Sequence, residues 1–236
     1  MNFKNNCMIC NKELIYLKEP KNYNCVICGK EFWVDAVCEE GHYVCDHCHS
    51  KEGVAIIKEI CSHSTSKNPI ELMDRIMREP SIHIHGPEHH VLVGASLLTA
   101  YKNCGGDINL NEALLEMVRR GKQVPGGVCG FWGCCGAAVS SGIAVSIITG
   151  STPLKNEEWK LSNLMTSNAL KAIGEIGGPR CCKRDSFTAV KEAAEFMENN
   201  LKVKIEIPEE ISCSFSKLNQ QCIGNRCPYH IGSMEN

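Results

Sequence analysis

The spacing of apolar residues predicts that most of this chain is helical. Asn68-Pro69 is a cap followed by proline at a first helical position, and Gly105-Gly106 is a typical helix end. A short-strand pattern occupies residues 15–17, 31–34 and 203–207. The ranges with helical periodicity or helix-end signals are 53–62, 69–77, 87–104, 110–121, 137–148, 153–173 and 186–199.

These patterns divide the chain into three parts. Residues 1–50 predict a zinc-ribbon-like metal-binding module, because cysteine knuckles and short strands crowd there with few large apolar residues. Residues 51–207 predict an all-helical domain, and residues 208–236 a cysteine-containing tail. The expected fold class is therefore mainly α, with a small N-terminal module and a cysteine-rich C-terminal tail.

The number of cysteines is the most informative feature of the composition. The chain has 17 cysteines among 236 residues, and its N-terminus shows no apolar signal-peptide core. We therefore expect a cytoplasmic protein whose reduced thiols serve metal binding or sulfur chemistry. Charge is nearly balanced, with 25 basic and 27 acidic residues, and the apolar run at 137–149 is too short to span a membrane.

Two C-x2-C pairs open the chain, Cys7 with Cys10 and Cys25 with Cys28. Paired knuckles at this spacing place four thiolates around a tetrahedral Zn2+, as in a zinc ribbon. The sequence therefore predicts a structural zinc site in this module.

A second set of ligands follows directly, in the segment CEEGHYVCDHCH. Cys45 and Cys48 form a third knuckle, and Cys38 is the natural third ligand. The candidates for the fourth ligand are His42, His49, Cys61 and His63. One or two zinc sites are expected, and the spacing leaves open whether they are sequential or cross-braced.

Histidines gather before the predicted helix at 87–104. His83 and His85 share one face of an extended segment, and His89 and His90 lie at the helix start. Such a cluster at the end of a buried helix points to a metal site or an anion site in a pocket. We expect His85 and His90 to bind metal, His83 to bind substrate, and His89 to act in acid–base chemistry with Glu88 as its helper.

Two glycine-rich loops carry adjacent cysteines ahead of helices. The first contains Cys129, Cys134 and Cys135, and the second contains Cys181 and Cys182. Thiolates are stabilised at helix N-termini. We expect the two loops to face each other across one cavity, with these five cysteines as ligands of an iron–sulfur cluster or as active thiols.

Basic residues flank the second loop. Arg180 and Lys183 stand beside the two thiols, where positive charge holds an anion and lowers thiol pKa. We therefore expect these two side chains to bind a small anionic or sulfur-containing substrate.

Three further cysteines lie in the tail, Cys213, Cys222 and Cys227, the last followed by Pro228. A cysteine-proline pair ends some iron–sulfur ligand sets. These cysteines are expected to bind metal, either as a cluster with one open iron or by completing a site with cysteines from elsewhere in the chain.

Taken together, the segments GHYVCDHCH, HGPEHH, PGGVCGFWGCCGA and GGPRCCKRD resemble an uncharacterised cysteine-rich protein family of methanogenic archaea and anaerobic bacteria. The resemblance spans most of the chain and implies an anaerobic, cytosolic setting. Residues 129–142 are more weakly similar to a small redox-associated family whose signature reads cysteine, then glycine-cysteine-alanine, then further cysteines. Here the order is Cys134-Cys135-Gly136-Ala137.

The hypothesis that joins these features is a metal- and thiol-dependent enzyme of anaerobic redox or sulfur metabolism, containing zinc and an iron–sulfur cluster, a 4Fe-4S type among the candidates. Two other classes stay open: a zinc-dependent module that binds a protein partner, and a carrier of sulfur or metal without catalysis of its own. The N-terminal module has no basic patch, which disfavours nucleic acid as a partner. No phosphate-binding loop, dinucleotide fingerprint or serine nucleophile elbow is present.

Overall fold

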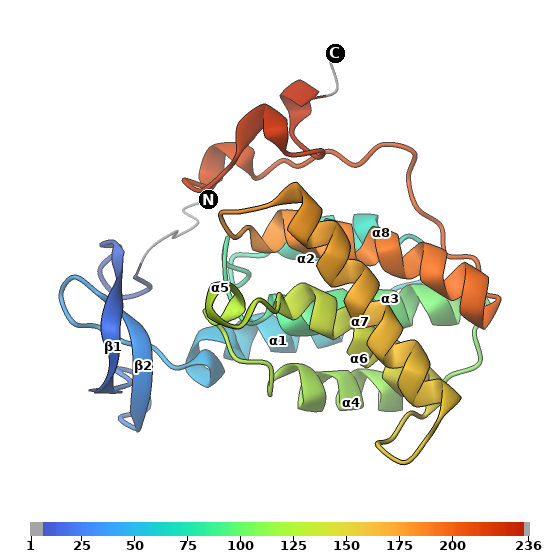
Figure 1. The fold of residues 1–236 in the computed structure, drawn as a ribbon, viewed down its shortest axis with the longest axis horizontal. Coiled ribbons are helices and arrows are strands. Elements are labelled where there is room, and N and C mark those ends of the chain that lie inside the picture. Colours follow the sequence, from blue (N-terminus) through green and yellow to red (C-terminus); the bar gives the residue numbers. More distant parts are fainter. Residues whose placement is uncertain (1–6, 234–236) are drawn as a thin grey trace.

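The structure is a computed structural model that describes residues 7–233 (Figure 1). It confirms a mainly helical chain with a small two-stranded N-terminal sheet. The first and last residues of the expected module and tail, 1–6 and 234–236, lie outside the described range. The helices of the described part are α1 (Asp46–His63), α2 (Pro69–Met77), α3 (His89–Asn103), α4 (Leu110–Gly121), α5 (Cys129–Trp132), α6 (Gly136–Thr149), α7 (Glu157–Ile176) and α8 (Cys182–Leu201).

The N-terminal module is a β-hairpin of β1 (Leu14–Asn24) and β2 (Glu31–Cys38). The strands are antiparallel, and their register pairs Asn24 with Glu31 at the turn and Leu14 with Cys38 at the open end. An irregularity between Tyr16 and Lys21 interrupts the ladder. The hairpin is thin, and most of its side chains are exposed, so it has little apolar core of its own.

Helix α3 is the centre of the helical domain. Its sequence is apolar almost all round, and 12 of its 15 residues are buried. It packs against α1, α2, α4, α6 and α8, which surround it in Figure 1. Because α3 begins at His89, this central helix also fixes the position of the histidine-rich segment.

Close approach of helices depends on small residues at two contacts. The main-chain N–H of Gly94 in α3 donates to Ser140 Oγ of α6 at 2.9 Å. Gly142 in α6 lies against α7, where a Cβ would meet Thr166 Oγ1 and would stand 2.9 Å from the Ser162 carbonyl oxygen. These contacts hold α6, and with it the cysteine loop at its start, against the core.

The C-terminal tail returns along α8 and packs on it (Figure 1). It contains three short 3-10 helices, η1 (Ser216–Leu218), η2 (Gly224–Arg226) and η3 (Ile231–Ser233). Phe215 and Tyr229 are buried, and the Tyr229 hydroxyl lies 3.1 Å from Thr188 Oγ1 of α8. The tail is therefore anchored on the helical domain by aromatic side chains.

Three local expectations differ from the structure. Helix α1 starts at Asp46, seven residues before 53, so it crosses the expected boundary between module and helical domain at residue 50. Helix α8 starts at Cys182 and not near 186, because Cys181 caps it by accepting the main-chain N–H of Arg184 at 3.5 Å. Residues 203–207 form no strand, since no neighbouring strand pairs with them in the described part of the chain.

The contact of α6 with α7 yields a stability prediction. We expect Gly142→Ala to lower the thermal midpoint by roughly 2–10 °C, because the new Cβ must push away main-chain atoms of α7. Gly174→Ala in α7 is the matched control, since a Cβ there meets no atom within 4 Å, and its midpoint is expected to stay or rise. Equal midpoints for Gly142→Ala and wild type, measured by circular dichroism, would contradict the close contact.

Candidate metal centres and active-site cavity

The first group of metal-ligand atoms comes from both ends of the hairpin sequence. Cys7, Cys10, Cys38 and His42 place their ligand atoms within 4.8 Å of one another. The Cys10 and Cys38 sulfurs are 3.4 Å apart, and His42 Nδ1 lies 3.7 Å from Cys38 Sγ and 3.9 Å from Cys7 Sγ. Three thiols and one imidazole around one point form a tetrahedral donor set, which suits a metal such as zinc.

The second group consists of Cys25, Cys28, Cys45 and Cys48, again with all sulfurs within 4.8 Å. The Cys28 and Cys45 sulfurs are 3.9 Å apart, and the Cys45 N–H donates to Cys25 Sγ at 3.4 Å. Cys45 is the residue before the first turn of α1 and Cys48 lies in that turn, so the helix start fixes these two thiols relative to each other. This four-thiol group also fits a structural metal ion.

The two groups are interleaved, which corrects the expectation that the first two knuckles share one ion. The hairpin explains why each of the first two knuckles shares its ion with later residues and not with the other knuckle. Its register brings Cys38 beside Leu14, near the first knuckle, while Cys25 stays at the turn and pairs with Tyr43 in an isolated bridge. The arrangement is therefore cross-braced, one of the two alternatives that spacing left open. His49, Cys61 and His63 are not ligands in these two groups.

A cavity of about 340 Å³ lies between the module and the helical domain. The hairpin, both cysteine loops and the starts of α3, α6 and α8 supply its walls. Two contacts span the junction: Gly126 N–H donates to Asp46 Oδ2 at 2.7 Å, and the rings of Tyr16 and Phe131 pack edge to face at 6.0 Å. The volume is within the range of ligand pockets.

The thiols that line this cavity come from both cysteine loops, Cys129, Cys134 and Cys135 from the first and Cys182 from the second. Cys135 caps α6, and its sulfur lies 3.8 Å from Asp185 Oδ2. Burial raises the pKa of Cys182 to about 12, and burial with nearby Asp185 raises the pKa of Cys135 above its usual range. Buried thiols of this kind give up their protons when a cation binds their sulfurs.

The four predicted histidines do not meet at one ion. His85 Nε2 lies 3.1 Å from Asn219 Oδ1, His89 Nδ1 lies 3.0 Å from the Gly86 carbonyl, and His90 Nδ1 lies 2.9 Å from the Val124 carbonyl. These three line the large cavity, whereas His83 does not. The expected metal pair of His85 and His90 is absent from the metal-ligand groups found in residues 7–233, because each ring is held by a different partner.

The buried Glu88 instead forms a group with the half-buried His49 and His83, and the ligand atoms of the three residues lie within 4.8 Å of one another. His83 N–H donates to Glu88 Oε1 at 2.9 Å, and His49 Nδ1 lies 3.4 Å from Glu88 Oε2. Burial favours the neutral acid, yet hydrogen bonds from the two histidines lower the pKa of Glu88 well below its usual range. The carboxylate is thus ionised and is an oxygen donor for a cation at this point.

Lys183 completes this network from α8, and it is fully buried. Its ammonium donates to the His83 carbonyl at 2.8 Å and to His89 Nε2, 3.1 Å away. Burial lowers the pKa of Lys183 to about 8, although nearby Glu88 opposes that shift. Lys183 is therefore a fixed internal cation, while Arg180 is the basic residue that lines the large cavity.

The adjacent thiols Cys181 and Cys182 face different cavities. Cys182 lines the large cavity, whereas Cys181 lines a smaller one together with Cys213, Cys222 and Cys227 of the tail. The expectation that all five loop cysteines share one site therefore holds for four of them only, because successive residues at a helix start point in directions about 100° apart. Arg184, a third basic residue beside the thiols in the sequence, lines the smaller cavity. Asp185 and Asn219 also lie at these cavities, and nothing in the sequence distinguishes these two from surface polar residues.

The fold and the site define a cysteine-rich, mainly helical protein with a cross-braced pair of candidate metal centres. A family model described as a family of unknown function, DUF5714, matches residues 57–230, and the chain belongs to this family. This agrees with the resemblance to an uncharacterised family. No curated protein and no solved structure matches the chain. Within the described residues, every helix is too short or too polar to cross a membrane.

The interleaved ligands give a prediction about metal content. Cys10→Ser/Cys38→Ser removes two ligands of one group and is expected to lower zinc by about one equivalent after zinc reconstitution. Cys10→Ser/Cys25→Ser removes one ligand of each group and is expected to lower zinc by about two. The measurement is plasma mass spectrometry on protein desalted in the presence of a weak chelator. The opposite pattern of losses would restore the sequential pairing.

Proposed function

We propose that this protein is a metal- and thiol-dependent enzyme of redox or sulfur metabolism, with its active site in the large cavity. The observation that carries the proposal is the convergence of four thiols from two separate loops on one ligand-sized space. Structural cysteines are normally dispersed through a core or paired in knuckles, whereas these line a cavity together with histidines and an arginine.

The four thiols, Cys129, Cys134, Cys135 and Cys182, fit an iron–sulfur cluster, which is a modification of the five-cysteine set expected from the sequence. Cys129 and Cys182 both lie near enough to Cys135 to raise its pKa further, beyond the effects of burial and Asp185. Cys135 lies at the start of α6 and Cys182 opens α8. Main-chain N–H groups of Ala137 and Gly86 partly offset the rise in the pKa of these thiols that burial causes, and iron displaces the remaining protons when it binds the sulfurs. A bound cluster would supply one-electron chemistry or a Lewis-acidic iron at this position.

Arg180 is suited to hold an anionic substrate in the same space. It lines the cavity and is half-buried, and no hydrogen bond or ion pair joins its guanidinium to another side chain among residues 7–233. An unpaired guanidinium binds oxyanions and carboxylates in a bidentate manner. A small anion, including a sulfur oxyanion, is therefore the substrate class that this wall favours.

His89, the acid–base candidate from the sequence, belongs to a buried hydrogen-bond network at the cavity wall and positions its neighbours there. Its Nδ1 proton is held by the Gly86 carbonyl, which leaves Nε2 to accept the hydrogen bond from the Lys183 ammonium. Glu88, 3.7 Å from His89 Nδ1, balances the charge of Lys183 within the protein interior. The hydrogen bonds among these residues therefore hold the His89 ring in one orientation and keep the Lys183 ammonium close to the thiols.

The carrier alternative is less well supported by the geometry. A sulfur or metal carrier needs exposed thiols that can meet a partner enzyme, and the tail was the candidate for that role. Cys213 and Cys227 are only 8% and 6% exposed, and both line the small cavity under the tail. The geometry therefore supports a catalytic role better than a carrier role.

The large-cavity cluster predicts a specific loss of iron. Cys135→Ser/Cys182→Ser, purified without oxygen, is expected to lose about four irons and about four sulfides per chain and the matching visible absorbance. Cys104→Ser, at the C-terminal end of α3 and outside both cavities, is the control and is expected to keep them. Iron and sulfide contents equal to wild type in the double variant would remove these thiols from any cluster.

The anion assignment is tested separately with thiosulfate as the probe. We expect wild type to bind thiosulfate in anaerobic calorimetry, and Arg180→Gln to weaken binding about 10- to 100-fold, the effect of losing a charge-assisted hydrogen bond. Arg75→Gln on the exposed side of α2 makes the same charge change away from the cavity and is expected to have no effect. Binding that is absent in wild type, or equal in both variants, would reject an anion site at Arg180.

A further inference from the structure

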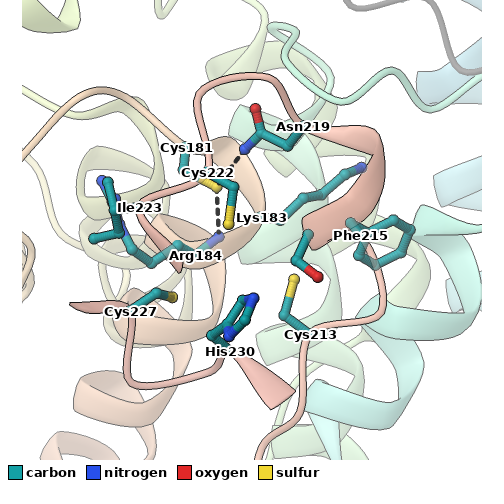
Figure 2. Close-up of a pocket in the computed structure, with 11 residues that line it drawn as sticks. Cys181, Lys183, Arg184, Cys213, Phe215, Asn219, Cys222, Ile223, Cys227 and His230 are labelled. Atoms are coloured by element: carbon teal, nitrogen blue, oxygen red, sulfur yellow. Dashed lines mark hydrogen bonds between the residues drawn. The ribbon is translucent and has the colours of Figure 1, made fainter. Parts of the chain in front are cut away.

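A second cavity, smaller than the first, lies between the start of α8 and the folded tail (Figure 2). Cys181 enters it from the helix, and Cys213, Cys222 and Cys227 enter it from the tail. Figure 2 shows the sulfurs of the three tail cysteines directed toward the space that they enclose. Four cysteines thus line one common space although they are spread over 47 positions of sequence, from 181 to 227.

The tail is folded in a way that delivers these thiols. Cys213 N–H donates to the Tyr229 carbonyl at 2.7 Å, which brings the two ends of the tail together. The buried rings of Phe187 and Tyr229 pack edge to face at 5.7 Å and join that closed loop to α8. Anchoring of the loop by aromatic residues explains why the cysteines converge without a short knuckle motif.

The distances between the sulfurs distinguish a site for an iron–sulfur cluster from a site for a single metal ion. Sulfurs around one tetrahedral zinc lie about 3.8 Å apart, given zinc–sulfur bonds of about 2.3 Å. Among residues 7–233, both N-terminal groups meet a limit of 4.8 Å, but no three of the four cysteines here do. In a cluster each cysteine binds a different iron, so its ligand sulfurs stand farther apart than those around one ion.

The charge of the surroundings favours a negatively charged ligand. Lys183 and Arg184 line the cavity and are buried, and no acidic side chain lines it. Arg184 Nε binds Asp185 Oδ1 at 2.9 Å, and one terminal nitrogen binds the Pro179 carbonyl at 3.0 Å. The other terminal nitrogen is buried without a partner, although the guanidinium is only 3% exposed. Such an orphaned donor indicates an acceptor that belongs in this space.

Hydrogen bonds to sulfur complete the environment. Asn219 Nδ2 donates to Cys181 Sγ at 3.3 Å, the Arg184 main-chain N–H donates to the same sulfur at 3.5 Å, and Gly224 N–H donates to Cys222 Sγ at 3.4 Å. N–H donors aimed at cysteine sulfur stabilise thiolates and tune the potential of bound clusters.

We propose that Cys181, Cys213, Cys222 and Cys227 bind a [4Fe–4S] cluster at the junction of α8 and the tail, separate from the large cavity. All four irons then have a cysteine ligand, which suits electron transfer and not substrate binding. Because Cys181 is next to Cys182, this cluster lies one residue from the wall of the proposed active site. The assignment rests on the tail cavity alone and stands whether or not the large cavity holds a cluster.

The test uses the full chain, reconstituted with iron and sulfide without oxygen. Cys213→Ala and Cys222→Ala are each expected to lose about four irons per chain and one electron paramagnetic resonance signal of the dithionite-reduced protein, while zinc is retained. Cys104→Ala is the matched control and is expected to keep both iron and signal. Unchanged iron and signal in both tail variants, or zinc bound by the tail in wild type, would overturn the proposal.

A milder variant decides the matter if the cysteine variants fail to fold, as shown by circular dichroism. Asn219→Ala removes an N–H donor to Cys181 and is expected to lower the reduction potential of the tail cluster while iron content stays at the wild-type value. An unshifted potential would overturn the assignment. Since Cys135→Ser/Cys182→Ser targets only the large cavity, its iron loss reports on the proposed active site, and failure of either proposal is recognised separately.

Discussion

Burial of the Lys183 ammonium is the constraint on which the arrangement of both cavities depends. A lysine without solvent must find acceptors and a compensating charge, and Lys183 finds the His83 carbonyl, His89 Nε2 and the nearby Glu88 carboxylate. Those partners belong to the segment that leads into α3, the central helix of the domain. The start of α8 is thereby fixed against the start of α3, and the residues around Lys183 can face only the spaces on either side of it.

The same constraint explains why neighbouring residues of the second cysteine loop line different cavities. Cys182 and Arg180 lie toward the module, while Cys181 and Arg184 lie toward the tail. Lys183 stands between them, and its ammonium is 4.9 Å from the centre of the Phe215 ring, which belongs to the tail cavity. The start of α8 thus supplies a wall of each cavity. The charge of Lys183 acts on the small cavity, which it lines, and on His85 and His89 at the large cavity.

Much of the fold could be predicted from the sequence because local signals were strong. The helices α2 and α4 have the predicted bounds, since Asn68-Pro69 marks the start of α2 and the spacing of apolar residues marks α4. The pairing of metal ligands could not be predicted, because it is set by the register of β1 on β2 and knuckle spacing alone is the same for either pairing. The divergence of Cys181 and Cys182 was equally hidden, since a glycine-rich loop gives no helical phase until the first residue of α8 is known. The predicted histidine cluster failed as one site because each ring found a different main-chain or side-chain partner.

Interleaving of the N-terminal ligands has a consequence for the order in which the protein matures during synthesis. The first four-ligand group is complete once His42 has left the ribosome, whereas the second must wait for Cys48 in the first turn of α1. The cysteines around the tail cavity are complete only once Cys227 has emerged. The ligands therefore become available in order from the N-terminal module to the tail, and the last set to be complete is the one between α8 and the tail.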